Sequence, residues 1–201
     1  MKRLFTGATM LLGAATSQGH AGALQSDPVA GQIEAFGQSL LSAAKLSQGR
    51  ALVLMPAVEQ TFNFSVMARF IVGVSWAQMS DGDHASLVSA LKRYTAARIA
   101  YEFDHLAKQQ FVVDPIVQSR GPDRLVKTQF LTPGDAPVHI DYRLREYDGS
   151  WKVIDVYTNG VSVLTTERAD VSSTLEAEGP AAVASKLEQA ADRLSSLVRV
   201  Q

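Results

Sequence analysis

The chain has 201 residues and a formal net charge of −1, with 19 basic and 20 acidic residues. Because these charges are interleaved and form no basic run, the composition argues against nucleic acid as a partner and against membrane docking by charge alone. Cysteine is absent, which excludes disulfides, thiolate metal sites and a cysteine nucleophile. The length suits one domain with a substantial core.

The first residues have the pattern of a secretory signal. Two basic residues follow the initiating Met, Leu4–Ala15 form a short apolar segment, and Ala21-Gly22-Ala23 supply the small residues that a signal peptidase requires. Such a segment is too short to cross a hydrocarbon core of ~30 Å. We therefore expect a signal peptide at residues 1–23 and one exported domain at residues 24–201. A retained amphipathic anchor is the alternative.

The first half of the exported domain is predicted to be helical. Asp27 suits the N-cap of a helix with Pro28 at its first position. Gly49 separates this helix from a second, short one that is expected to run to Met55. Pro56 either kinks that helix or opens the next segment.

Two more helices are expected before the sheet. The first is apolar and spans residues 62–73. The second starts from a loop at residues 80–83 that offers several N-cap side chains, and it runs to about residue 103. Its apolar stripe is broad, which favours a helix buried on more than a narrow face.

From residue 109 onward the apolar pattern alternates, which is typical of strands. The predicted strands are residues 110–118, 125–131, 138–145 and 151–157, with a hairpin turn at Asp148-Gly149. Two helices follow, one ended by Gly179 and the last opened by Pro180. The sequence predicts an α+β fold in which N- and C-terminal helices pack on one face of a four-stranded curved antiparallel sheet.

Motifs for metal, phosphate or nucleophilic chemistry are not found in the sequence. His84, His105 and His139 have no spacing that suits a zinc site. The segment Asp81-Gly82-Asp83 lacks the other ligands of a calcium loop. The segment around Ser162 lacks the second glycine of a nucleophile elbow, and Ser162 is expected to cap a helix instead. We therefore predict no metal and no cofactor.

One catalytic alternative uses polar residues on adjacent strands, as in ketosteroid-isomerase-like folds: Asp141, Tyr142, Asp155 and Tyr157. A buried carboxylate beside a tyrosine can serve as a general base with an oxyanion donor. Strand alternation, however, places Asp141 and Tyr142 on opposite faces unless a bulge intervenes. Asp155 is expected instead to order the turn at residues 159–160 or to pair with Arg143 or Arg145. We predict that the protein is not an enzyme.

Several local motifs follow one another in a recognisable order. They are Phe62-x-Phe64 with Met67-Ala68-Arg69, Gly73-x-x-Trp76, Trp151-Lys152-Val153-Ile154-Asp155-Val156, and Gly160-Val161-Ser162 with Arg168 further along. On these motifs the chain, from Asp27 to Leu197, resembles the MlaC family of periplasmic lipid carriers, also called toluene-tolerance auxiliary components. Within it the chain is most similar to the hopanoid-biosynthesis-associated branch, HpnM. Asn63 and Asn159 depart from the family pattern, which usually has Asp and Glu at these positions.

The resemblance implies a periplasmic carrier that holds acyl chains in an apolar pocket between sheet and helices. Such carriers shuttle lipid between an outer-membrane lipoprotein complex and an inner-membrane ABC transporter with an MCE-domain subunit. The implied cargo is a phospholipid or a hopanoid, and a monomer is expected. The alternative is an accessory protein of such a transporter that binds protein through exposed faces, such as the face of Arg143 and Arg145, and binds no lipid.

The candidate wall of this pocket combines apolar residues from the predicted helices and strands. It consists of Met67, Phe70, Ile71, Leu87, Leu91, Tyr94, Ile140, Tyr142, Leu144, Ile154, Val156, Val161 and Leu164. The same residues also suit an ordinary filled core, because a filled core and a hollow one require the same residue types.

Overall fold

The computed structural model describes residues 27–102 and 109–198, which form a curved antiparallel sheet and a set of helices. The helices are α1 (Pro28–Ala44), α2 (Arg50–Thr61), α3 (Phe64–Val72), the 3-10 helix η1 (Gly73–Gln78), α4 (Asp81–Glu102), α5 (Val163–Glu178) and α6 (Pro180–Leu197). The strands are β1 (Gln110–Val113), β2 (Gln118–Arg120), β3 (Asp123–Leu131), β4 (Val138–Tyr147), β5 (Ser150–Thr158) and β6 (Val161–Ser162). The predicted signal peptide and its cleavage site lie outside the described residues.

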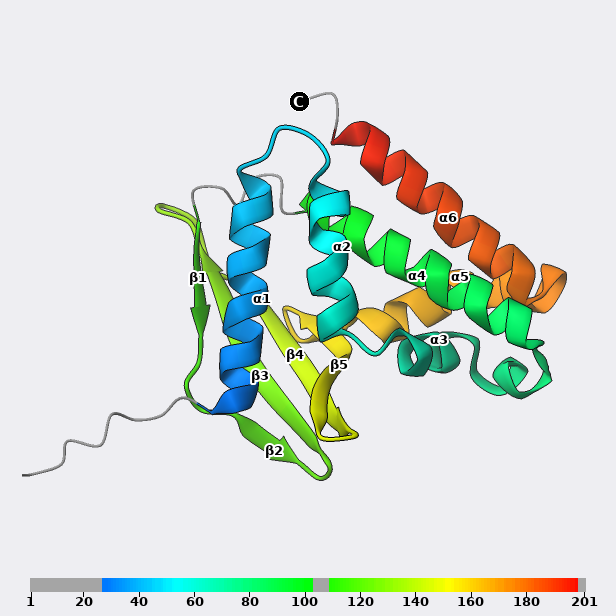
Figure 1. Ribbon diagram of the computed structural model, residues 1–201, viewed down its shortest axis with the longest axis horizontal. Helices are drawn as coiled ribbons and strands as arrows, with labels where there is room; N and C mark the ends of the chain where they lie inside the picture. The colour runs from blue at the N-terminus through cyan, green and yellow to red at the C-terminus, as the bar shows by residue number, and fades with distance from the viewer. Residues whose placement is uncertain (1–26, 103–108, 199–201) are drawn as a thin grey trace, which may run out of the picture.

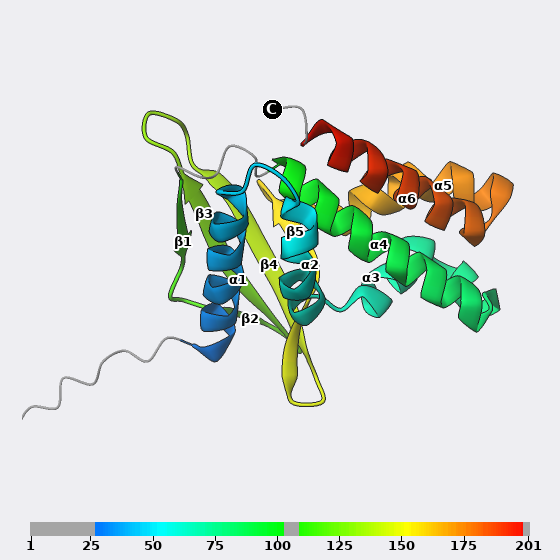
Figure 2. The same ribbon diagram turned by 45° about the horizontal axis from the view of Figure 1, so that its top comes forward.

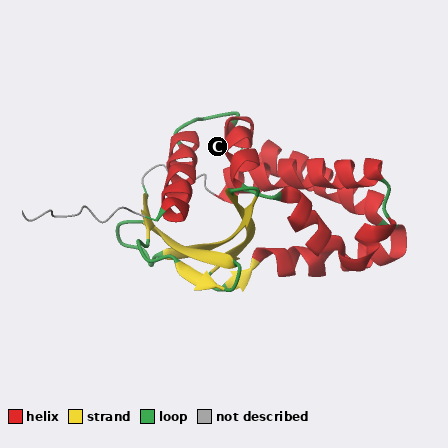
Figure 3. Cartoon of the chain, turned by 60° about the horizontal axis from the view of Figure 1, so that its bottom comes forward, coloured by secondary structure: helices red, strands yellow, loops and turns green. Residues whose placement is uncertain are grey.

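The helices are divided between two regions. α1 and α2 lie over the concave face of the sheet, whereas α3 to α6 extend away from one side of it (Figure 1). In a second view α4 and α6 run side by side along the length of this helical region (Figure 2). Seen from another side, the curvature of the sheet is open toward α1 and α2 (Figure 3). Within the described ranges, no helix combines the length and the apolar character needed to span a bilayer.

Capping residues start the helices largely where the sequence predicts. The Asp27 carboxylate accepts a hydrogen bond of 2.9 Å from the amide of Val29, as expected for an N-cap. Ser80 and Asp83 form a reciprocal cap at the start of α4, in which the Asp83 amide donates a 3.1 Å hydrogen bond to the Ser80 hydroxyl. Position 103, where this helix was expected to end, lies outside the described residues.

The prediction that α2 ends near Met55 is wrong, because the helix continues through Pro56 to Thr61. Proline removes one backbone hydrogen bond, to the carbonyl four residues earlier. That residue is Leu52, which is 78% exposed, so water can replace the missing donor. The helix is then held by the burial of Leu54 and Val58.

The sheet has six strands rather than the four expected, in the order β1-β3-β4-β5-β6 with β2 also paired to β3. The predicted strand at residues 110–118 is interrupted at Pro115, which has no amide to contribute to the ladder. Asp114 marks the break, because its side chain accepts a 2.8 Å hydrogen bond from the amide of Ile116. The additional strand β6 is short and follows a turn in which Asn159 and Gly160 have φ values of 50° and 83°.

A β-bulge in the pairing of β4 with β5 decides which side chains share the concave face. Tyr142 pairs with Val156, but Leu144 pairs with Val153, so the register shifts between Arg143 and Leu144. Cross-strand partners lie on the same face of a sheet. Val153 and Val156 therefore both face the helices, although strict alternation would separate them.

The opposite face of the sheet carries a buried ionic cluster. Asp123 is 1% exposed, and its carboxylate accepts hydrogen bonds of 2.6 Å from Nε of Arg143 and of Arg145. Burial alone raises the pKa of Asp123, but the hydrogen bonds from Arg145 and Arg143 outweigh it and hold the pKa below its ordinary value of 3.8. The two arginines thus pair with Asp123 and not with Asp155, which was one of the two roles expected for Asp155.

Replacing Asp123 by Asn should lower the free energy of unfolding by about 1–3 kcal/mol at neutral pH, because charge-assisted bonds are lost at a buried position. The folded state lowers the pKa of Asp123. The wild type should therefore have the higher free energy of unfolding at pH values above the ordinary pKa of Asp123, and this difference should fade as the pH falls through the lowered pKa of the folded state. Urea denaturation of both proteins across acidic and neutral pH measures this. The exposed Asp135→Asn is the control, and equal losses in both variants contradict the assignment.

Candidate functional site

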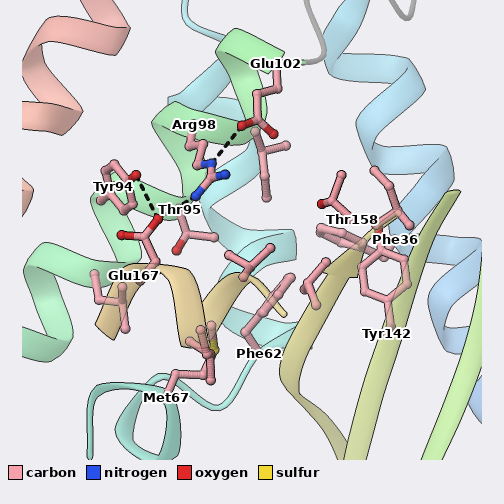
Figure 4. A pocket seen from close by; sticks show the side chains of 16 residues that line it. Phe36, Phe62, Met67, Tyr94, Thr95, Arg98, Glu102, Tyr142, Thr158 and Glu167 are labelled. Carbon is pink, nitrogen blue, oxygen red and sulfur yellow. Dashed lines mark hydrogen bonds and ion pairs between the residues drawn. The ribbon is translucent and has the colours of Figure 1, made fainter. Parts of the chain in front are cut away.

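An apolar pocket lies between the concave face of the sheet and helices α4 and α5. Its side chains come from α1, the connection between α2 and α3, α3 itself, α4, β4, β5 and the first turns of α5 (Figure 4). The residues that line it are Phe36, Phe62, Met67, Leu91, Tyr94, Thr95, Arg98, Ile99, Glu102, Ile140, Tyr142, Val156, Thr158, Val163, Leu164 and Glu167.

The free space in this pocket is small. All empty space within it, including the part open to solvent, amounts to about 700 Å³, but only about 80 Å³ is available to the centres of water molecules. Pockets that hold drug-sized ligands typically have volumes of roughly 300–1,000 Å³. In this conformation the pocket is therefore a narrow, partly closed space.

Aromatic side chains form one wall of the pocket. Phe36 of α1 lies edge-on to Phe62, at 5.4 Å between ring centroids, and to Tyr142, at 6.1 Å. Tyr142 is 3% exposed, and burial raises the pKa of its hydroxyl above the usual range. This wall is nearly all carbon, so it suits the exclusion of water.

The opposite end of the pocket is charged. Nη1 of Arg98 donates to the Glu167 carboxylate over 2.5 Å, and Nε of Arg98 donates to Glu102 over 2.7 Å. The hydroxyl of Tyr94 donates to the same Glu167 oxygen over 3.0 Å. The contacts of Arg98 and Tyr94 with Glu167 link α4 to α5 across the pocket (Figure 4).

Burial shifts the pKa values of these groups. Glu167 is 6% exposed, and its burial raises the pKa above the ordinary value of 4.5 although Arg98 acts in the opposite direction. Burial, followed by the charge of Glu167, raises the pKa of Tyr94 to about 12. Burial alone lowers the pKa of Arg98, but its hydrogen bond to Glu102 and the surrounding charges outweigh this and raise it.

Part of the predicted wall does line the pocket, and the seven residues concerned are Met67, Leu91, Tyr94, Ile140, Tyr142, Val156 and Leu164. Ile71, Leu87 and Leu144 are buried in the core away from it. Ile154 is the extra residue of the β-bulge in β5 and lies outside the lining. Contact of any of these residues with lipid stays a prediction.

Two further residues of the predicted wall are exposed and lie outside this pocket. Val161 is 62% exposed in β6, which is an edge strand. Phe70 is 42% exposed on the outer side of α3, where the Arg168 guanidinium lies 5.6 Å from its ring centre. Helical spacing groups Phe70 with Met67, but of these two only Met67 is buried in α3.

The charged residues at the polar end of the pocket, Arg98, Glu102 and Glu167, were not predicted from the sequence. Arg98 interrupts the apolar stripe of α4, and this interruption was the available signal. Glu167 gave none, because the surrounding sequence of α5 is polar. Phe36 and Phe62 were recognised as apolar but not as pocket residues, since their approach to Tyr142 depends on how α1 packs on the sheet.

The residues of the catalytic alternative do not converge on this pocket. Tyr142 lines it, whereas Asp141 and Tyr157 are cross-strand partners on the other face. Asp155 instead orders the junction of β6 and α5, because it accepts a 2.8 Å hydrogen bond from the Ser162 hydroxyl. Ser162 caps α5 as predicted.

The described His, Asp and Glu residues form no group of three that is close enough to hold a metal ion. His105 lies outside the described residues. His84 contacts the ring of Trp76 and the Trp76 carbonyl, and His139 is exposed on β4.

Comparison with known proteins gives a family and a fold. Residues 34–189 match the family model described as MlaC protein. A phospholipid-binding protein from Ralstonia solanacearum, solved in complex with a phospholipid, has the same fold with a TM-score of 0.71 and 17% sequence identity. The alignment covers 83% of this chain and 98% of that one. No curated protein matches this chain in sequence.

Replacing Glu167 by Gln should remove a group whose folded-state pKa is raised. A carboxyl with a raised pKa contributes most to stability below its ordinary value and loses that contribution as the pH rises through the raised one. The free energy of unfolding of the wild type should therefore increase relative to Glu167→Gln as the pH falls from neutral toward 4.5. Urea titrations at a series of pH values measure this difference.

The exposed Glu176→Gln on the same helix is the matched control and should show a smaller change with pH. A wild-type advantage over Glu167→Gln that stays constant across this range contradicts the prediction.

Proposed function

The chain belongs to the MlaC family, and we propose that it is a lipid carrier whose cargo lies in the pocket between α4, α5 and the sheet. The observation that carries this proposal is the pocket itself, which has an apolar body and a polar end. A bound phospholipid in the Ralstonia solanacearum protein of the same fold supports it. Phospholipid is therefore the first candidate cargo.

The energetics of carrying lipid explain why a pocket of this character is needed. Each methylene group removed from water contributes about 0.8 kcal/mol, so two chains of ~15 carbons represent over 20 kcal/mol gross. When a lipid leaves the membrane, only a dry, apolar interior in the carrier can offset a free-energy cost of that size. Phe36, Phe62, Met67, Leu91 and Val156 provide such surface.

The pocket must widen before it can hold such a cargo, because about 80 Å³ is far smaller than a diacyl lipid. Two of its walls, α4 and α5, meet across it through the side chains of Tyr94, Arg98 and Glu167. Lipid entry would therefore separate apolar side chains that contact one another in this conformation. We infer that the structure represents a contracted conformation of the carrier.

The finer parts of the proposal rest on family analogy. We propose a periplasmic protein, exported by residues 1–23, that shuttles lipid between an outer-membrane lipoprotein complex and an inner-membrane ABC transporter with an MCE-domain subunit. It is proposed to act as a monomer without catalysis. The motif at Trp151–Tyr157 resembles the HpnM branch, so a hopanoid is the second candidate cargo.

The narrow pocket also favours one alternative, an accessory protein of the same transport system that binds no lipid. In that case the pocket is a residual packing defect and stays closed. The two functions differ in whether the protein retains lipid when it is purified without a partner.

Native mass spectrometry of the exported protein from the periplasm of its host, with lipid analysis of the extract, tests the proposal. We expect a stoichiometric adduct, and its mass separates phospholipid from hopanoid. Protein that is empty and takes no lipid from donor vesicles contradicts the carrier function and favours the accessory one.

Filling the pocket should abolish the adduct. Val156→Trp places a large side chain in the pocket from a partly exposed position, and overpacking should lower the melting temperature by at most about 10 °C. Val74→Trp, at a position that is 89% exposed and outside the pocket, is the matched control and should retain lipid. Equal lipid content in a folded Val156→Trp protein contradicts this placement of the cargo.

A further inference from the structure

We propose that the charged end of the pocket is a headgroup site, in which Arg98 binds the phosphodiester of a phospholipid and the flanking Glu102 and Glu167 favour a headgroup that carries an ammonium group. This inference rests on the proposed carrier function and adds a specificity to it. The preferred ligand class is a zwitterionic aminophospholipid rather than an anionic phospholipid.

The position of Arg98 suits a group at the border between water and the apolar interior. Its side chain is 31% exposed, and it lines the same pocket as Leu91 and Ile99 on α4. A lipid whose chains occupy the apolar body has its phosphate at the point where the pocket becomes polar. Figure 4 shows Arg98 at the end of the pocket away from Phe36 and Tyr142.

The guanidinium of Arg98 keeps donors for a ligand. Nε and Nη1 donate to Glu102 and Glu167, whereas Nη2 has no hydrogen-bond partner among residues 27–102 and 109–198. Guanidinium groups present planar, paired donors that match phosphate oxygens. Thr95, one turn earlier on α4, also lines the pocket.

The charge balance around Arg98 decides which headgroup it suits. Two carboxylates contact one guanidinium, and Asp170 adds a further negative charge close to Glu167. The nearby Arg93 does not offset these charges, because it pairs with Glu188 and Asp192. An anionic headgroup would add negative charge to a site whose described residues already carry an excess of it.

A zwitterionic headgroup resolves this conflict. Its phosphate can accept hydrogen bonds from Nη2 of Arg98. Its ammonium can approach Glu102, whose side chain is 49% exposed at the mouth of the pocket. Opposite charges at these short distances attract, and the attraction strengthens as water is excluded. Glu102 is the residue that tells the two lipid classes apart, because it is the exposed carboxylate of the pair.

The test compares three lipids with identical dioleoyl chains: phosphatidylethanolamine, phosphatidylglycerol and diacylglycerol. Delipidated full exported protein is incubated with vesicles that contain each lipid, and bound lipid is quantified by native mass spectrometry. The wild type should bind phosphatidylethanolamine more tightly than phosphatidylglycerol. Arg98→Gln should weaken binding of phosphatidylethanolamine by about 10- to 100-fold and change diacylglycerol binding little.

Two further variants sharpen the result. Glu102→Gln should narrow the preference for phosphatidylethanolamine over phosphatidylglycerol, because the carboxylate that favours the ammonium is lost. Arg93→Gln, on the same helix but paired to α6, is the matched control and should bind all three lipids as the wild type does. Arg98→Lys keeps the charge and serves as the second variant if Arg98→Gln does not fold.

The possible outcomes separate this inference from the carrier function. Equal binding of phosphatidylethanolamine and phosphatidylglycerol by the wild type overturns the headgroup specificity while the carrier function stands. An equal loss of all three lipids in Arg98→Gln overturns the phosphate contact and makes Arg98 a structural residue. Wild-type protein that takes up none of the three lipids contradicts both the carrier function and the headgroup site.

Discussion

A short backbone pairing between the helical connection at Phe62–Asn63 and β5 sets the geometry on which the pocket depends. The amide of Asn63 donates a 2.9 Å hydrogen bond to the carbonyl of Val153, and Phe62 forms a parallel bridge to the same residue. This contact covers the edge of β5 beyond the short strand β6. It also fixes the point from which α2 leads toward the sheet and α3 leads away from it.

The aromatic wall follows from this pairing. Phe62 is 5% exposed and contacts Phe36 on one side and Phe64 on the other. Aromatic contacts of this geometry add to the free energy of burial, so they hold α1 and the start of α3 in a fixed relation to β5. The pocket is the space that these aromatic rings, α4 and α5 leave unfilled.

The charged end of the pocket lowers the stability of the fold, and ligand binding is a physical reason for this cost. A buried carboxylate such as Glu167 loses its hydration, and its partner Arg98 restores only part of that loss. An apolar residue at this position would close the gap between α4 and α5 more simply. The charged groups instead keep one end of the pocket polar, which suits a molecule with one polar end and an apolar body.

The sequence by itself determined the element types and many of their ends. Asp27 and Ser162 cap helices, Asp148-Gly149 forms a tight turn, and alternating residues mark the strands, because these features depend on neighbours along the chain. Membership of the family was also predicted from local motifs. The expected strand at residues 110–118 is divided at Pro115, a break that the sequence itself signals.

Only the tertiary structure decided which apolar residues line a pocket and which fill a core. Leu87 and Leu91 are one helical turn apart and both are buried, yet only Leu91 faces the pocket. The β-bulge at Arg143 and Leu144 moved Ile154 out of the wall, and the meeting of Arg98 with Glu167 joins residues that are 69 positions apart. Local sequence patterns report burial and periodicity, whereas a pocket depends on the register and packing of segments that meet only when the chain folds.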